Sequence, residues 1–89
     1  MMRLDKFLKV SRLIKRRTVA KEVCDGGKIS VNGKTAKAGS EVKPGDILEL
    51  SLGPRVLKVE IVSVMDTVRA DQAKELYKIL EDVRISQEW

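Results

Sequence analysis

The residues in this chain most able to do chemistry are cations, and half of them lie in one stretch near the N-terminus. Nine of the eighteen lysines and arginines fall between Arg3 and Lys28, with only Asp5, Glu22 and Asp25 to balance them. These nine are Arg3, Lys6, Lys9, Arg12, Lys15, Arg16, Arg17, Lys21 and Lys28. The stretch is therefore +6, and because the whole chain is +5, the remaining residues sum to −1. Such an asymmetry is typical of a surface that binds a polyanion.

Other kinds of chemistry have few candidate residues. The sequence has no histidine to act as a base near neutral pH or to bind zinc, and its one cysteine, Cys24, has no partner for a disulfide. The acidic pair Glu81-Asp82 is expected to be solvated, and Gly26-Gly27 follows a helix instead of preceding one, unlike a phosphate-binding loop. We therefore expect no enzyme activity, no metal site and no cofactor.

Charge and composition do not by themselves identify the polyanion. A charge run is usually a solvated surface, but that explanation must account for nine cations against three anions on two adjacent helices. RNA, DNA and acidic lipid all remain open at this point. A membrane-surface helix needs a wide exposed apolar face, whereas the apolar residues here are needed for the core. No apolar run approaches the roughly 20 residues that span a bilayer, so we expect a cytoplasmic protein without a membrane partner.

Hydrophobic periodicity places most of these cations on two short helices within a single domain. Leu4, Phe7 and Leu8 recur at helical spacing and predict a helix over about residues 3–10. A second helix is expected over residues 16–25, starting between Arg16 and Thr18 and ending at the two glycines. Its expected inner face consists of Val19, Ala20, Val23 and Cys24. In the connector between the helices, Leu13 and Ile14 are expected to enter the core.

After Lys28 the hydrophobic period changes from 3.6 to 2, which predicts strands. Asn32-Gly33 is a strong hairpin signal between a strand at 29–31 and a short return strand at 35–37. The Lys-Pro-Gly-Asp sequence at 43–46 predicts a type II turn. Two further strands are expected over 47–52 and 56–65, the second being the longest, with a bulge or burial on both faces near Ile61.

Residues 66–89 differ in composition, with a net charge of −2. Their apolar residues follow helical spacing and predict a helix over about 69–83 that packs on the sheet, followed by a frayed end with Trp89. These apolar positions are Ala70, Ala73, Leu76, Tyr77, Leu80 and Val83. The predicted fold class is α+β, with two basic N-terminal helices packed on a small, mostly antiparallel sheet and a C-terminal helix. We expect a domain over 1–65 and, over 66–89, a helical extension of it.

The order of motifs across residues 3–52 resembles the RNA-binding domain family named after ribosomal protein S-four, also called the alpha-L motif. The marks are Arg-Leu-Asp at 3–5, the arginine pair at 16–17, a glycine at 27, and Ile-Ser-Val-Asn-Gly-Lys at 29–34, with Ile29 in place of the usual valine. A Pro-Gly-Asp turn at 44–46 completes the set. Each mark is weak alone, but the combination is specific. The fold of the family is the α+β arrangement described above.

Over its whole length the chain is similar to stand-alone bacterial members of that family, in particular to factors of ribosome-associated quality control. The resemblance implies binding to large ribosomal subunits that carry an obstructed peptidyl-tRNA, with contacts to ribosomal RNA and tRNA. It further implies that the tRNA is held in the P site while a protein partner supports tailing of the stalled chain. We expect a monomer. Two alternatives remain: a recycling or assembly factor of the large subunit without a role in tailing, and a DNA-binding regulator.

Matched residue by residue, the resemblance implies RNA contacts at Arg3 and Arg17, with Asp5 holding the surface of the first helix. Arg16 departs from the pattern, because many relatives have a small hydroxylated capping residue there. We assign Arg3, Arg16 and Arg17 to specific contacts, since a planar guanidinium can bridge two phosphate oxygens. The other expected RNA-binding residues supply a general positive field and are Lys6, Lys9, Arg12, Lys15, Lys21 and Lys28. The hairpin is expected to reach the RNA through Lys34 and Lys37.

Overall fold

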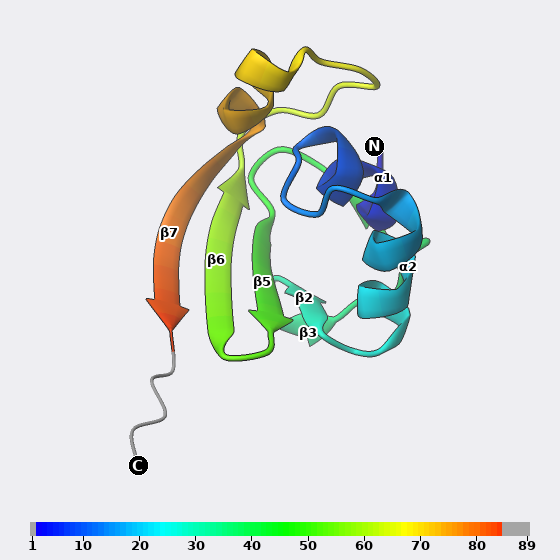
Figure 1. The fold of residues 1–89 in the computed structure, drawn as a ribbon, viewed down its shortest axis with the longest axis vertical. Helices are drawn as coiled ribbons and strands as arrows, with labels where there is room; N and C mark the ends of the chain where they lie inside the picture. Colours follow the sequence, from blue (N-terminus) through cyan, green and yellow to red (C-terminus); the bar gives the residue numbers. More distant parts are fainter. Residues whose placement is uncertain (1, 85–89) are drawn as a thin grey trace.

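A five-stranded antiparallel sheet and two short helices enclose the core of this protein, as seen in a computed structural model that describes residues 2–84 (Figure 1). Trp89, for which a frayed end was predicted, lies outside these residues. The elements in chain order are β1 (Met2–Arg3), α1 (Leu4–Val10), α2 (Arg17–Asp25), β2 (Ile29–Val31), β3 (Lys34–Thr35), β4 (Glu41–Val42), β5 (Ile47–Leu52), β6 (Arg55–Ile61), a 3₁₀ helix η1 (Ala70–Leu76) and β7 (Tyr77–Arg84).

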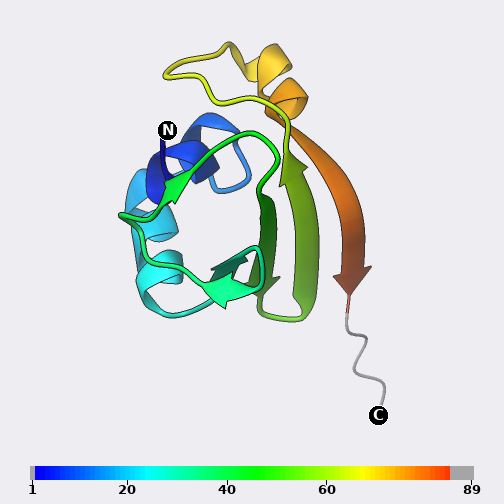
Figure 2. The same cartoon turned by 180° about the vertical axis from the view of Figure 1, so that it is seen from behind.

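The strands form two sheets. The larger has the order β3-β2-β5-β6-β7, and each neighbouring pair is antiparallel. The smaller pairs β1 with β4, which places β4 beside the start of the chain (Figure 2). Both helices lie on the side of β2 and β5, whereas β7 forms the far edge of the larger sheet (Figure 1). The expected α+β class with a mostly antiparallel sheet is confirmed.

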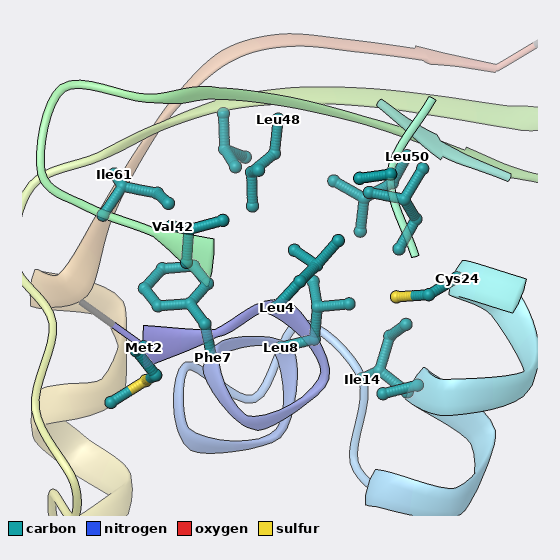
Figure 3. Close-up of a cluster of buried hydrophobic side chains, with 14 of the residues drawn as sticks. Met2, Leu4, Phe7, Leu8, Ile14, Cys24, Val42, Leu48, Leu50 and Ile61 are labelled. Atoms are coloured by element: carbon teal, nitrogen blue, oxygen red, sulfur yellow. The ribbon is translucent and has the colours of Figure 1, made fainter. Parts of the chain in front are cut away.

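The core is aliphatic apart from Phe7. In Figure 3 the side chains of Leu4, Phe7 and Leu8 on α1 point toward the sheet, where they meet Leu48 and other buried strand residues. Burying each such side chain contributes about 1.5–3 kcal/mol. The largest fully buried strand side chains are Ile29, Val42, Leu48, Leu50, Val59 and Ile61. This core therefore holds α1, with its charged neighbours, against the sheet.

The two predicted turns are confirmed. Asn32 and Gly33 both have positive φ, 51° and 84°, and join Val31 to its partner Lys34, as a two-residue type I′ hairpin requires. Gly45 has φ 94°, and the N–H of Asp46 donates to the carbonyl of Lys43 at 3.1 Å. A proline in the second position cannot adopt positive φ, so the latter turn is type II.

Asp46 fastens these two turns together. Its side chain is 7% exposed, and the carboxylate accepts hydrogen bonds from Nδ2 of Asn32 at 3.1 Å and from the N–H of Lys43 at 3.0 Å. The amide oxygen of Asn32 in turn accepts the N–H of Ile47 at 2.9 Å. Burial raises the pKa of Asp46, but the bonds from Asn32 and Lys43 outweigh it and hold the pKa below its usual 3.8.

Both N-terminal helices form where predicted. α2 starts at Arg17, within the expected range, and Gly27, with φ 76°, follows its end. In the connector, Ile14 is buried and Leu13 packs against the core as expected. The prediction for Val19 is wrong, because its side chain is 40% exposed. Ala20 and Cys24, one turn apart, form the buried line of α2, and Val19 is rotated about 100° away from it.

The predicted helix over 69–83 is wrong in its second half, where the chain forms the strand β7. β7 pairs with β6 along its length, from Tyr77 opposite Ile61 to Arg84 opposite Arg55. Without β7 the edge of β6 would be unpaired, and this tertiary pairing outweighs a weak helical pattern. The first half does form a helix, but its apolar residues recur every three positions, which matches the period of a 3₁₀ helix.

The bounds of two strands and the position of the bulge also differ from prediction. β6 ends at Ile61 instead of Met65, because the N–H groups of Val62 and Ser63 turn to the carbonyl of Leu76 at 2.8 and 3.2 Å. β7 is consequently the longest strand. The register shift occurs at Lys58 and Val59, where β7 supplies one additional residue, so the bulge is on β7 and not near Ile61. The return strand of the hairpin is residues 34–35 and not 35–37.

Candidate nucleic-acid interface

Asp5, at the start of α1, connects the beginnings of both helices. It is 2% exposed, although a first-turn carboxylate is normally in solvent. Its Oδ1 accepts the N–H of Lys6 at 2.8 Å and Nε of Arg3 at 3.2 Å. Its Oδ2 accepts Nη2 of Arg3 and Nε of Arg17, both at 3.4 Å. One buried carboxylate therefore fixes two arginines that come from different parts of the chain.

The two arginines keep much of their binding capacity. Their side chains are 53% and 50% exposed, and Arg17 uses only its Nε toward Asp5, which leaves the terminal nitrogens as donors. They line an open hollow of about 340 Å³, here called the Asp5 hollow. Its lining residues are Arg3, Asp5, Arg17, Thr18 and Lys21. Guanidinium groups held at a fixed spacing can bind phosphate oxygens through charge-assisted hydrogen bonds.

The loop between β3 and β4 supports this arrangement through hydrogen bonds to both helices. The N–H of Leu4 donates to the carbonyl of Ser40 at 2.7 Å, and the N–H of Asp5 donates to that of Ala38 at 3.2 Å. The N–H of Ala38 donates to Oδ1 of Asp25, at the end of α2, at 3.3 Å. The loop therefore joins the start of α1 to the end of α2. Sequence patterns gave no signal for this contact.

A second hollow, of about 140 Å³, lies at the other end of α1. It is lined by Lys9, Val10, Arg12, Asp66, Thr67 and Val68 and is here called the Arg12 hollow. Nζ of Lys6 donates to Oδ1 of Asp66 at 2.9 Å, and this bond holds the pKa of Asp66 below its usual value. The expected role of Lys6 in a general positive field is thus modified, because an acidic residue sixty positions away partly neutralises it.

Comparison with known proteins places this geometry in a family. Residues 2–48, which include both helices and the two turns, match the family model described as the S4 domain. The chain belongs to the S4 domain family. It is 58% identical over 85 residues to the RQC P-site tRNA stabilizing factor of Halalkalibacterium halodurans, which covers 96% of this chain and 97% of that protein. It is 52% identical over 86 residues to the protein of the same name from Bacillus subtilis, over 97% and 100% of the two chains.

The fold of this S4 domain is also found in a solved structure, the trimeric heat shock protein 15 of Vibrio cholerae. The two structures superpose with a TM-score of 0.81 at 34% identity, over 88% of this chain and 80% of that one. The expected resemblance to the S4 family and to stand-alone ribosome-associated members is confirmed by these matches.

Among the remaining cations of the S4 domain, Lys21 lines the Asp5 hollow, Lys9 and Arg12 line the Arg12 hollow, and the others line neither. Within residues 2–84, six of the nine N-terminal cations form no ion pair: Lys9, Arg12, Lys15, Arg16, Lys21 and Lys28. Arg16 occupies the capping position of α2 without a side-chain cap. Lys34 is exposed on β3, and Nζ of Lys37 donates to the carbonyl of Asp25 at 3.3 Å. The structure therefore brings Arg3, Arg17 and Lys21 into one hollow and leaves Arg16, Lys28 and Lys34 outside it.

Nothing in the described part of the S4 domain adds a nucleophile or a metal site to this surface. Burial, assisted by the charges of Asp5 and Asp25, raises the pKa of the Cys24 thiol to about 11, so it stays protonated at neutral pH. Over residues 2–84 there is no cluster of three histidine, cysteine or carboxylate side chains that could hold a metal ion. In the same residues, neither helix has the length and apolar character needed to cross a membrane.

Proposed function

We propose that this protein binds large ribosomal subunits obstructed by peptidyl-tRNA and stabilises the tRNA in the P site during tailing of the stalled chain. The observation that carries the proposal is the 58% and 52% identity, over nearly the whole of each chain, to proteins named RQC P-site tRNA stabilizing factor. The matched length includes β7 as well as the S4 domain, so the similarity extends beyond the basic helices.

The Asp5 hollow supplies the chemistry for this role. RNA helices present phosphates and 2′-hydroxyl groups in a wide, shallow groove and are recognised mainly by shape. Arg3 and Arg17 are already oriented by the buried carboxylate of Asp5, so less side-chain entropy is lost when they bind phosphate. Arg16 adds a specific contact beside Arg17, and the general field comes from Lys6, Lys9, Arg12, Lys15, Lys21, Lys28 and Lys34.

The proposed role requires binding and no covalent step, so the protein acts without enzyme activity or cofactor. Its place of action is the cytoplasm, where it contacts ribosomal RNA and tRNA as a monomer. A protein partner that recruits the tailing substrate completes the reaction. Residues 66–89 are separate in sequence from the basic helices. We therefore assign the RNA-binding domain to residues 1–65 and treat residues 66–89 as its extension.

Co-sedimentation with purified large subunits tests the proposal. The protein should pellet with subunits that carry peptidyl-tRNA and much less with vacant subunits, and Arg17→Ala should reduce that binding about tenfold. Lys78→Ala is the matched control, because it removes one exposed cation from β7, away from both hollows. Equal binding to vacant subunits would favour an assembly factor, and release of the peptidyl-tRNA on addition of the protein would favour a recycling factor.

A further inference from the structure

Arg12 has a backbone conformation that its residue type does not favour. Among residues 2–84, only Arg12 and Asn32 are non-glycine residues with positive φ, at 61° and 51°. Asn32 is explained by its position in the type I′ hairpin, where asparagine is a preferred residue. Arginine has no such preference for the left-handed region, in which its Cβ crowds the backbone. Arg12 is therefore strained at a position where glycine would not be.

The turn after α1 is held by backbone hydrogen bonds of Arg12 and its neighbours. Its N–H donates to the carbonyl of Lys9 at 3.1 Å, and the N–H of Ile14 donates to that of Leu8 at 3.0 Å. These bonds end α1 and turn Ile14 into the core, in the manner of the left-handed residue that commonly terminates helices. Because they involve main-chain atoms alone, glycine would form them with less strain. The arginine side chain is thus not needed for the turn.

The side chain lies exposed at the Arg12 hollow together with Lys9. Neither cation forms an ion pair with any residue in 2–84, and Asp66, the acidic residue of this hollow, is engaged by Lys6 at 2.9 Å. A cation after a helix is favoured by the helix dipole, but Lys9 already occupies the last turn of α1. The dipole therefore does not explain an arginine in a strained position two residues beyond the helix.

We propose that Arg12 is a second specific contact to RNA phosphate, separate from the Asp5 hollow. This inference rests on the proposed function and adds a second fixed point to its binding surface. Arg3 precedes the seven residues of α1 and Arg12 follows them, so α1 separates the two points by about 10 Å of helical rise. Two separated guanidinium contacts fix the orientation of an RNA strand on the protein, which a single contact does not.

The test substitutes Arg12→Gly and measures affinity for large subunits carrying peptidyl-tRNA, together with the midpoint of thermal unfolding. We expect the affinity to fall about tenfold while the midpoint stays the same or rises, because glycine relieves the strain. Arg12→Asn, which also tolerates positive φ, should behave in the same way. Lys15→Ala is the control, since it removes one exposed cation from the same connector, and it should reduce affinity less than threefold.

Four outcomes would overturn the inference. An equal loss for Lys15→Ala would show that Arg12 acts only through net charge. A midpoint that falls by several degrees in both Arg12 variants would show that the side chain has a structural role. Affinity unchanged in the Arg12 variants but reduced in Arg17→Ala would refute this contact and leave the proposed function intact, whereas failure of the unaltered protein to bind these subunits would refute both.

Discussion

Arg17 combines a structural contact with a free binding surface. Its Nε contacts Asp5 at 3.4 Å, and its side chain, which is half exposed, lines the Asp5 hollow. A lysine at this position carries its donors on one nitrogen and lacks the planar fork with which arginine meets two separate partners. Substitutions of Arg17 therefore distinguish recognition that depends on the shape of the guanidinium from simple attraction between opposite charges.

Arg17→Ala is expected to weaken RNA binding by about 1–3 kcal/mol, the range for a charge-assisted contact. Arg17→Lys should recover only part of this loss, because it restores charge without the planar fork. Stability to urea should fall by about 1 kcal/mol or less in both, since Asp5 keeps its bonds to Arg3 and to the N–H of Lys6. Titration with a labelled RNA stem-loop and urea unfolding measure the two quantities. Full binding by the lysine variant would mean that the contact is purely electrostatic.

Asp46 gives the fold a defined dependence on acid. Its pKa is lowered in the folded state, so its contribution to stability is fully present above the ordinary value of 3.8 and is lost as pH falls through the lowered value. Urea unfolding from pH 6 to pH 2 should therefore show less loss of stability on acidification for Asp46→Asn than for the unaltered chain. Asn32→Gly keeps the positive φ and removes one hydrogen bond to Asp46. Its loss of stability on acidification should therefore lie between those of Asp46→Asn and the unaltered chain. Identical pH profiles for all three proteins would contradict this assignment.

At the scale of elements, β7 replaces a predicted helix and completes the sheet. It pairs with β6, and Nε and Nη2 of Arg55 donate to the carboxylate of Asp82 at 2.9 and 2.8 Å. Three of its apolar side chains remain 41–50% exposed: Ile79, Leu80 and Val83. β7 therefore stabilises the sheet mainly through backbone pairing with β6 and by partly covering it. The two hollows lie on other elements.

Two truncations separate the roles of these elements. A chain ending at Arg84 should bind RNA and unfold like the full chain, because the removed residues carry no positive charge. A chain ending at Leu76 loses β7 and should be destabilised by about 3 kcal/mol or more, through lost backbone hydrogen bonds and exposure of Val59 and Ile61. Urea unfolding and RNA titration provide the comparison. Loss of RNA affinity in the folded 1–84 chain would show that the binding surface extends beyond the basic helices.

At the scale of the whole molecule, positive charge is concentrated on the side of the helices. If about five cations neutralise phosphates, the logarithm of RNA affinity should fall against the logarithm of salt concentration with a slope of about 3–5. The six N-terminal cations that form no ion pair within residues 2–84 are sufficient for that number. RNA titrations at several salt concentrations between about 50 and 300 mM measure this slope. A flat response would mean that the charge does not contact RNA.

Preference for RNA over DNA tests the shape of the same surface. An RNA stem-loop should bind several-fold more tightly than a DNA duplex of the same sequence at equal salt, because only RNA presents an A-form groove with 2′-hydroxyl groups. Arg3→Lys and Arg17→Lys should reduce this preference while retaining the charge. Equal affinity of the unaltered protein for both nucleic acids would favour a DNA-binding regulator.

Features that depend on neighbouring residues could be predicted from the order of amino acids alone. The apolar spacing of Leu4, Phe7 and Leu8 located α1, and Asn32-Gly33 and Pro44-Gly45 located two turns. Periodicity, capping and turn preference are short-range properties, so a single chain reveals them. The charge asymmetry and the S4 motifs likewise needed only the order of residues.

Tertiary structure decided the features that depend on residues far apart in the chain. Residues 77–84 form a strand because the edge of β6 is available for pairing. The spacing of apolar residues within 77–84 carries no information about that edge. The burial of Asp5 between Arg3 and Arg17, and the capture of Lys6 by Asp66, required the helices and the segment after β6 to be placed in space. A buried carboxylate must be paired where it lies, and only the folded chain shows which cations meet it.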